Sequence, residues 1–210
     1  MSEVPAWRSQ KPQRSDGELV LDGQAVVGVA EKELQEALAR SLARPGDRVI
    51  EIGYGLGLAH DALRQIGLGE HWVIEGNKWL AAECISESSG DSSVPIVVFD
   101  TWEHALGLLP AAYFDAILFD PFPLDKVAEA LPLWRDKFAY VANRAAGPMC
   151  RVLKTGALLG IINFDLSTIE SRWIEESFES RFKTVPLGYE DASLNSAVQL
   201  NAAVQILAKQ

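Results

Sequence analysis

The stretch that decides the fold is Arg48-Val49-Ile50-Glu51-Ile52-Gly53-Tyr54-Gly55-Leu56-Gly57-Leu58. Its first half is rich in β-branched residues and shows no alternation, which is typical of a strand covered on both faces. The glycines that follow let the backbone turn sharply and let a ligand approach without a side chain in the way. A strand that ends in a glycine-rich turn and then opens a helix predicts a nucleotide site.

Strands and helices alternate along the rest of the chain. Strands are predicted over residues 48–52, 70–75, 96–99, 114–120, 158–163, 184–188 and 198–207. Helices are predicted over residues 26–43, 58–66, 79–87, 101–109, 138–153 and 168–180, with Gly147-Pro148 splitting or kinking the fifth. Residues 1–18 are expected to be extended or loosely helical, and Thr155-Gly156-Ala157 is expected to be a turn.

This alternation predicts an α/β fold with a doubly wound, Rossmann-like sheet. The last two predicted strands are separated by only a short polar segment, which suggests an antiparallel pair at one edge. That ending favours the class I S-adenosylmethionine-dependent methyltransferase fold, with seven strands and an antiparallel last strand. A dinucleotide oxidoreductase is the less favoured alternative, because it would usually continue into a second unit that 210 residues leave no room for.

The composition is that of a globular protein, with 48% hydrophobic and 23% charged residues. A formal net charge of −10 argues against a nucleic-acid partner and against binding to anionic membranes. The cysteines, Cys84 and Cys150, form no disulfide or metal pattern, so we expect a cytoplasmic location. The histidines, His60, His71 and His104, are scattered along the chain, no spacing among them suggests a zinc site, and we expect no metal. The sequence leaves open whether the protein is a monomer or a homodimer.

Polar residues follow the predicted strands at the edge where a doubly wound sheet binds its ligand. Glu75, at the end of the second strand, can accept hydrogen bonds from both hydroxyls of a ribose. Asp100 and Thr101, after the third strand, are placed to meet an adenine, although a strand-end aspartate is often only a helix cap. Together they predict S-adenosyl-L-methionine as cofactor and S-adenosyl-L-homocysteine as product. The residues expected to bind it are Glu51, Gly53, Tyr54, Gly55, Gly57, Leu58, Glu75, Gly76, Asn77, Asp100, Thr101 and Asp120.

Two strings in the chain are more specific than the glycine turn: Glu70-His71-Trp72-Val73-Ile74-Glu75-Gly76-Asn77 and the run from Tyr113 to Leu124. With these strings the chain resembles guanidinoacetate methyltransferase and the related small-molecule arginine N-methyltransferases. The resemblance extends from Trp7 to the final strand. Residues 100–103 and 151–156 also fall in register with the family.

The resemblance implies which residues hold the methyl acceptor. Asp120 and Glu31 correspond to the two acids that bind the guanidinium, with Asp120 as the proton acceptor, and both are expected to be catalytic. Two carboxylates around one planar cation with five donors are chemically reasonable. Glu31 alone, beside Lys32 and Glu33, would otherwise be interpreted as part of a solvated helix face. The substrate-binding residues that the resemblance implies are Trp7, Glu31, Asp120, Asn163, Phe164 and Asp165, with residues 1–25 as an arm that closes over a single domain of residues 26–210.

The chain also departs from the family. Val27 and Gln35 stand where the family carries methionines, and Asp165 stands where guanidinoacetate methyltransferase has a neutral hydroxyl residue. A carboxylate at 165 would repel a bare substrate carboxylate but could pair with an α-ammonium group. Because arginine has an α-ammonium and guanidinoacetate has none, arginine is slightly favoured as the substrate.

Two alternatives keep the cofactor but change the role. In one, the acceptor is another small amine or a hydroxylated metabolite, and Glu31 is dispensable. In the other, the chain is a non-catalytic, cofactor-binding partner subunit, against which the acidic residues Glu75, Asp100 and Asp120 argue.

Overall fold

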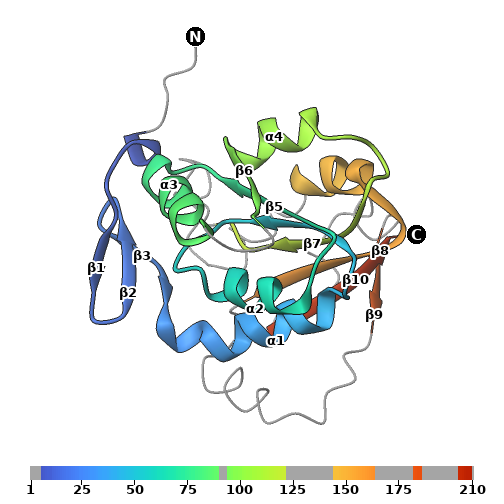
Figure 1. Ribbon diagram of the computed structural model, residues 1–210, viewed down its shortest axis with the longest axis horizontal. Helices are drawn as coiled ribbons and strands as arrows, with labels where there is room; N and C mark the ends of the chain where they lie inside the picture. The colour runs from blue at the N-terminus through green and yellow to red at the C-terminus, as the bar shows by residue number, and fades with distance from the viewer. Residues whose placement is uncertain (1–5, 90–93, 122–143, 164–181, 186–202, 210) are drawn as a thin grey trace.

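The sheet that carries the predicted site has five parallel strands at its centre (Figure 1). These are β4 (Arg48–Ile52), β5 (Glu70–Glu75), β6 (Ile96–Phe99), β7 (Phe114–Phe119) and β8 (Leu153–Asn163), arranged in the order β6-β5-β4-β7-β8. The sheet continues through β10 (Ala203–Lys209) to β9 (Phe182–Val185), and β10 runs antiparallel to both of its neighbours. The computed structural model describes residues 6–89, 94–121, 144–163, 182–185 and 203–209. The predicted doubly wound sheet and its antiparallel final strand are therefore confirmed.

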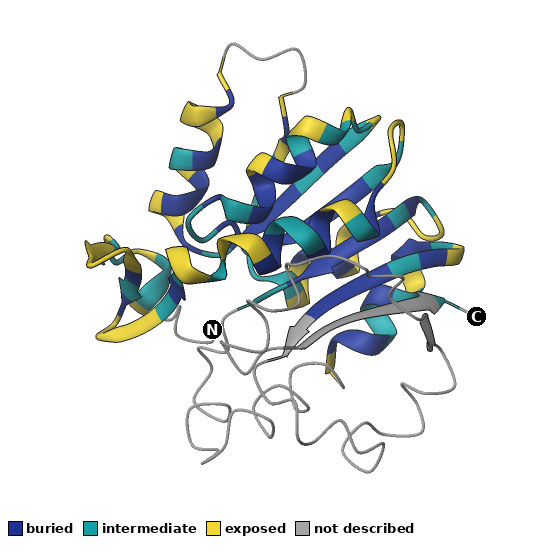
Figure 2. Cartoon of the chain, turned by 90° about the horizontal axis from the view of Figure 1, so that it is seen from below, coloured by how far each residue is buried: buried dark blue, intermediate teal, exposed yellow. Residues whose placement is uncertain are grey.

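Helices cover both faces of this sheet. The helices α1 (Lys32–Leu42) and α2 (Leu58–Ile66) pack on one face, and α4 (Trp102–Leu108) and the helical residues 144–152 pack on the other (Figure 1). The helix α3 (Lys78–Glu87) packs through Leu80 and Cys84 near Val73 of β5. Buried residues follow the strands and the inner sides of the helices (Figure 2). No helix in the described ranges is long and apolar enough to cross a membrane.

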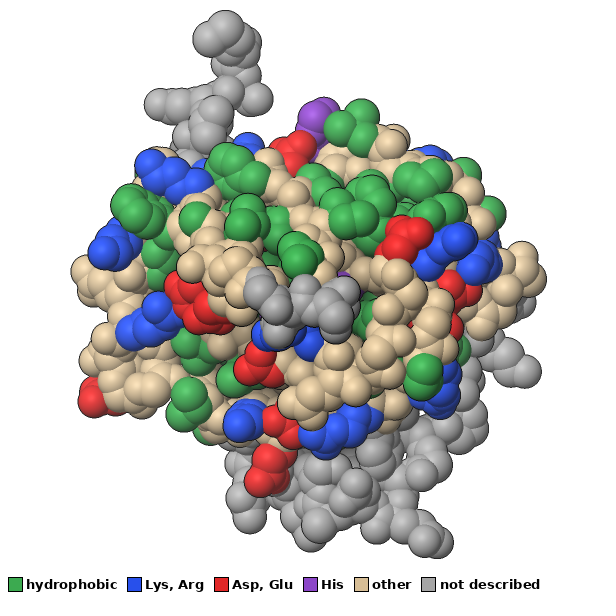
Figure 3. Space-filling model, viewed as in Figure 1, with side chains coloured by type: hydrophobic (Ala, Val, Ile, Leu, Met, Phe, Trp, Pro, Cys, Tyr) green, Lys and Arg blue, Asp and Glu red, His purple; other side chains and the backbone are tan. Residues whose placement is uncertain are grey.

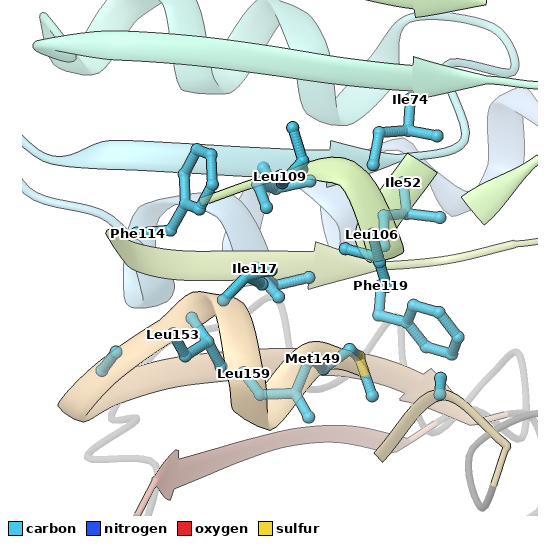
Figure 4. Close-up of a cluster of buried hydrophobic side chains, with 14 of the residues drawn as sticks. Ile52, Ile74, Leu106, Leu109, Phe114, Ile117, Phe119, Met149, Leu153 and Leu159 are labelled. Atoms are coloured by element: carbon cyan, nitrogen blue, oxygen red, sulfur yellow. The ribbon is translucent and has the colours of Figure 1, made fainter. Parts of the chain in front are cut away.

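Alternation along β7 explains how one strand serves two cores. Ile117 and Phe119 point toward Leu106 of α4 and Met149 of the 144–152 helix (Figure 4). Ala116 and Leu118, on the opposite face of the same strand, pack with α1 and α2. Each fully buried side chain of this size contributes about 1.5–3 kcal/mol, so both layers hold β7 firmly. A firmly held β7 fixes the position of Asp120, the residue that follows it.

The N-terminal segment differs from the expectation of an extended or loosely helical arm. It contains a three-stranded antiparallel sheet of β1 (Gln13–Ser15), β2 (Glu18–Leu21) and β3 (Gln24–Gly28). Asp16-Gly17 and Asp22-Gly23 form the two turns, and all four residues have positive φ angles. Asp-Gly between short strands is a strong hairpin signal because both central positions of a type I′ turn need positive φ. The expected division between residues 25 and 26 falls inside β3.

Two boundary predictions were also wrong, and the split that was one alternative for the fifth helix is absent from its described residues. The helix expected from residue 26 begins only at Lys32, after the 3-10 turn η2 (Val29–Glu31). Gly147-Pro148 does not split the fifth helix, which is continuous over residues 144–152. Residues 155–157 do not form a turn but lie within β8, where Gly156 has φ 78° and the pairing with β7 is irregular. Glycine therefore marked a bulge and not a chain reversal. The helix expected over 168–180 lies outside the described residues.

The N-terminal residues are bound to the end of β5 by one side chain. Asn77 caps α3, where its Oδ1 accepts from the N–H groups of Trp79 and Leu80 at 2.9 and 3.2 Å. Its Nδ2 donates to the carbonyls of Trp7 and Gln10 at 2.6 and 2.9 Å. Because the side chain is fully buried and makes four hydrogen bonds, removing it would leave several backbone groups unpaired. Asn77 therefore joins the 3-10 turn η1 (Ala6–Arg8) to the sheet.

We predict that Gly76→Ala detaches the N-terminal turn while leaving the sheet folded. A Cβ at Gly76 would lie 2.4 Å from Cη2 of Trp7, so the indole would have to move. Overpacking of this kind costs about 1–3 kcal/mol, and we expect faster proteolysis near the N-terminus together with a red-shifted tryptophan emission. Gly107→Ala is the matched control, because a Cβ there has no heavy atom within 4 Å. Equal proteolysis rates in the two variants would show that the ring does not need the space above Gly76.

Candidate active site

The site is organised by a close approach between the ends of β4 and β7. The N–H of Asp120 donates to the carbonyl of Ile52 at 3.2 Å, and the N–H of Gly53 donates to the carbonyl of Ile74 at 3.0 Å. A Cβ at Gly53 would lie 2.7 Å from the carbonyl oxygen of Asp120, and the φ of Gly53 is 90°. Only glycine satisfies both the contact and the left-handed backbone. The glycine turn and Asp120 are therefore neighbours, as the sequence predicted.

The small N-terminal sheet packs against the rest of the glycine turn. Gly55 and Gly57 have φ angles of 57° and 72°, and Gly57 precedes α2. A Cβ at Gly55 would lie 3.1 Å from Cγ1 of Val27, so β3 packs directly against the turn. The turn also carries Tyr54, whose ring is buried and whose hydroxyl donates to Glu87. Leu58 is half-buried at the first position of α2.

Glu75 lies under the turn and is almost fully buried. Its Oε2 accepts from the N–H of Tyr54 at 2.9 Å, and its Oε1 accepts from the N–H of Asn77 at 2.7 Å. The backbone of Gly55 provides a further hydrogen bond. Burial raises the pKa of Glu75 above its ordinary value, although these backbone hydrogen bonds oppose the shift. A carboxylate offers about four acceptor positions, so capacity remains for a ribose hydroxyl.

Glu51 binds two histidines inside the protein. Its Oε2 lies 3.0 Å from Nδ1 of His60 and 2.9 Å from Nε2 of His71, and the two rings stack with centroids 4.7 Å apart. Burial alone would raise the pKa of Glu51, but the hydrogen bonds from both histidines hold it below its ordinary value. An ionised carboxylate only accepts, so both ring nitrogens donate to it. Two histidines that are scattered in the sequence therefore meet at one carboxylate.

These three residues form a buried polar group between the sheet and α2. Glu51, His60 and His71 are 0%, 1% and 6% exposed, and their ligand-type atoms lie within 4.8 Å of one another. Such a group could hold a metal ion, but hydrogen bonds between the same atoms already satisfy the ring nitrogens that face Glu51. Among the described residues, Oε1 of Glu51 and Nδ1 of His71 have no hydrogen-bond partner. Glu51, two residues before Gly53, is thus bound to two histidines inside the protein.

Asp100 and Thr101 follow β6 and precede α4. Asp100 accepts from the N–H of Thr101 at 2.8 Å, is hydrogen-bonded to His104, and lies 3.5 Å from the guanidinium of Arg8. Although partial burial opposes it, the bonds from His104 and Thr101 hold the pKa of Asp100 below its ordinary value. Arg8 also lies 5.1 Å from the ring of Phe99, which is half exposed. The N-terminal turn therefore reaches the adenine end of the expected site.

Asp120 and Glu31 come together through Gln35. Nε2 of Gln35 donates to Oδ2 of Asp120 at 2.8 Å, and the same side chain is near enough to Glu31 to act against the rise of its pKa. Glu31 also accepts from the N–H of Gly28 at 2.9 Å, which fixes its carboxylate at the start of η2. Burial, followed by the negative charges of Glu31 and Glu51, raises the pKa of Asp120 to about 7. Burial likewise raises the pKa of Glu31. Such a pair is suited to a cation and to proton transfer near neutral pH.

The other predicted substrate residues are Trp7, Asn163, Phe164 and Asp165. The Trp7 indole packs over Gly76, beside the expected ribose position. Asn163 ends β8, where its backbone pairs with Ala203 of β10. Phe164 and Asp165 lie outside the described residues. On the face seen in Figure 3, acidic and basic side chains of the described residues are mixed.

Sequence reasoning missed the supporting residues His60, His71 and Gln35. His71 and Gln35 lie 20 and 85 positions from the carboxylates to which they are hydrogen-bonded. His60 is only nine positions from Glu51, but neither histidine belongs to a local ligand pattern. Gln35 stood out only as a departure from a family pattern. A polar residue at a core-facing position of α1, in line with Leu34 and Leu38, was the one available signal.

The residues at the strand ends fit S-adenosylmethionine. A buried carboxylate with free acceptor capacity ends β5, and an aspartate and a threonine follow β6. The glycine turn between β4 and α2 carries no Cβ at its three glycines, which leaves its backbone accessible. Glu75 would hold the ribose, Asp100 and Thr101 the adenine, and the glycine turn the methionine portion.

Solved structures with the same fold include methyltransferases. The first is the complex of the Haloferax volcanii Trm112 methyltransferase activator with its assigned methyltransferase, with TM-score 0.57, 14% identity, and coverage of 85% of this chain and 89% of that chain. A second, assigned as an S-adenosylmethionine-dependent methyltransferase of Streptococcus mutans, has TM-score 0.59, 12% identity, and coverage of 92% and 52%. A third, solved with S-adenosylhomocysteine, has TM-score 0.59, 12% identity, and coverage of 94% and 57%. The chain spans about half the length of the last two.

These likenesses establish the class I methyltransferase fold. The sequence itself is more specific: residues 4–191 match the sequence model of guanidinoacetate N-methyltransferase. That match includes the glycine turn, Glu31, Glu75 and Asp120. The protein is therefore a S-adenosylmethionine-dependent methyltransferase, and the chain belongs to the guanidinoacetate N-methyltransferase family.

Proposed function

We propose that this enzyme methylates the guanidino group of a small molecule, L-arginine or guanidinoacetate, with arginine slightly favoured. The observation that carries the proposal is the pair of carboxylates, Asp120 and Glu31, linked by one amide at the end of β7. Two acids that share one region of a partly buried site suit a planar cation with several N–H donors. When bound, S-adenosylmethionine supplies a methyl group that is activated by the positive charge on its sulfur.

The chemical problem for the protein is the proton on the acceptor. A guanidinium is protonated at all physiological pH values and has no available lone pair. Asp120 orients the cation and accepts a proton from the reacting nitrogen, which frees its lone pair. Glu31 neutralises the cation from the other side and sets its orientation. A raised pKa makes Asp120 a stronger base than an ordinary aspartate, and this is the direction the chemistry needs.

The preference for arginine rests on Asp165, which lies outside the described residues. Its carboxylate would pair with the α-ammonium of arginine, whereas a substrate with only a carboxylate at that end would be repelled. We predict that kcat/KM for L-arginine exceeds that for guanidinoacetate, and that Asp165→Ser reduces the ratio by about tenfold or more. Mass spectrometry of products from both acceptors, at equal concentrations, measures the ratio. Faster turnover of guanidinoacetate by the wild-type enzyme would contradict the preference for arginine.

Substitutions of the two carboxylates are predicted to affect the kinetic constants differently. Asp120→Asn removes the base, and we expect kcat/KM to fall about 100-fold or more. Glu31→Gln removes a charge-assisted contact, and we expect a loss of about 10- to 100-fold that appears mainly in KM. Isothermal titration with S-adenosylhomocysteine should give similar affinities for both variants and the wild type. Near wild-type rates in both variants would rule out the proposed mechanism.

Asp120→Asn should also stabilise the fold, which separates a lost base from a misfolded protein. Because the native state raises the pKa of Asp120 from 3.8 to about 7, the folded chain binds this proton more tightly than the unfolded chain. Stability is therefore lost as the pH rises through about 7, and the asparagine avoids that loss. We expect a gain on the order of 1–3 kcal/mol at pH 8 and little at pH 4, measured by urea unfolding. A lower stability at pH 8 would contradict the burial of an unfavourable charge.

The pH dependence of the reaction should report Asp120. Below a pH of about 7 the carboxyl is protonated and cannot accept a proton, so kcat/KM should rise with pH and level off above that value. A bound cation favours the ionised form of Asp120. The rise of kcat with pH should therefore occur at a lower pH than the rise of kcat/KM. Glu31→Gln removes a negative charge that disfavours ionised Asp120. In this variant the rise of kcat/KM should therefore also move to lower pH. A flat profile between pH 5 and 9, measured in a constant-ionic-strength buffer, would exclude Asp120 as the base.

A further inference from the structure

We propose that Gln35 is a positioning residue that orients the Asp120 carboxylate toward the guanidinium and favours the ionised form of Asp120. This inference deepens the proposed function and rests on it for the identity of the cation. The contacts of Gln35 themselves do not depend on which substrate the enzyme uses. They define a role for an amide at a helix position that would ordinarily carry an apolar side chain.

The position of Gln35 makes its polarity significant. It lies on α1 among Leu34 and Leu38, and only 6% of its surface is exposed. A buried amide without hydrogen bonds would cost several kcal/mol, so its partners decide whether it is tolerated. Both described partners of the side chain are carboxylates, Asp120 at 2.8 Å and Glu31 one helical turn earlier in the chain. The amide is therefore stabilised by the same two groups that the substrate needs.

The donor geometry of an amide matches the role. An ionised carboxylate accepts only, and the side-chain nitrogen of Gln35 provides an N–H group to Asp120 at 2.8 Å. The same side chain lies near Glu31, one helical turn earlier, and acts to lower the pKa of that carboxyl. Each carboxylate keeps further acceptor positions, so a bound cation can be added without displacing the amide. The substrate meets two carboxylates that are each already oriented by a hydrogen bond, Asp120 by Gln35 and Glu31 by the N–H of Gly28, which reduces the ordering cost of binding.

The charges around Asp120 make the second part of the role necessary. Glu31 from η2 and Glu51 from β4 both disfavour the ionised form, and burial acts in the same direction. Glu51 is in turn hydrogen-bonded to His60 of α2 and His71 of β5. The hydrogen bond from Gln35, on α1, acts in the opposite direction. Without it, a larger fraction of Asp120 would be protonated at neutral pH and unable to accept a proton.

The test is Gln35→Met, which keeps the length of the side chain and removes both N–H donors. Gln65→Met is the matched control, because Gln65 is exposed on α2. The ionisation of Asp120 is followed by ¹³C NMR of aspartate carboxyl groups in the substrate-free protein, with the signal assigned by its loss in Asp120→Asn. Methyl transfer to arginine and guanidinoacetate is measured between pH 6 and 10 on the same samples.

We expect the midpoint of Asp120 to rise by about one pH unit or more in Gln35→Met and to stay unchanged in Gln65→Met. At pH 7 the turnover of Gln35→Met should fall about tenfold, and part of the loss should be recovered at pH 9, where Asp120 is ionised again. The remaining deficit should appear in KM. Recovery at high pH would not follow from a purely structural defect.

An unchanged midpoint for Asp120 in a folded Gln35→Met protein would overturn the proposal. Where Gln35→Met does not fold, Gln35→Glu serves instead, because it keeps the shape and adds a third acid, and the midpoint should then rise further. A midpoint that does not rise in Gln35→Glu would also overturn the proposal. A raised midpoint, in an enzyme whose wild type methylates no guanidino compound, would support the role of Gln35 while contradicting the proposed substrate class.

Discussion

The close approach of Gly53 to the Asp120 carbonyl is the constraint on which the site depends. Two parallel strands, β4 and β7, end side by side, and a Cβ at Gly53 would lie 2.7 Å from that oxygen. The same glycine begins the turn that exposes backbone to the cofactor. One residue without a side chain therefore connects the cofactor-binding turn to the acid that is proposed to receive the proton. The large apolar residues on both faces of β7 keep this junction rigid.

Three acidic residues, Glu51, Glu75 and Asp120, lie at or near the ends of β4, β5 and β7. Each carboxylate is stabilised differently. Glu51 is held ionised by two histidines, whereas Glu75 is held by backbone N–H groups. The carboxylate of Asp120 is supported neither by histidines nor by backbone N–H groups but by a hydrogen bond from the amide of Gln35, and its pKa remains raised. A carboxylate that is poorly stabilised is costly to the fold, but it makes a better base. The differences in support thus separate the structural acids from the one suited to proton transfer.

The N-terminal residues belong to the site as much as the central sheet does. Val27 of β3 packs against Gly55, and Glu31 follows β3 directly, so the small antiparallel sheet places both. Asn77 links the backbone of the first turn to the start of α3, next to Glu75. This arrangement couples the order of the N-terminus to the ribose end of the cofactor site.

The sequence by itself determined the alternation of strands and helices from β4 to β7, the glycine turn after β4 and the acids at the strand ends. These features are local: periodicity, glycine turns and the residue after each strand are all read within about ten positions. It also contains the Asp-Gly hairpin signals at residues 16–17 and 22–23, where the two turns of the N-terminal sheet lie. The tertiary structure alone decided which carboxylates meet. Glu31, Gln35 and Asp120 are separated by up to 89 positions, and His60 and His71 reach Glu51 from different elements. Hydrogen bonding and pKa shifts depend on distances across the core, and no local pattern encodes those distances.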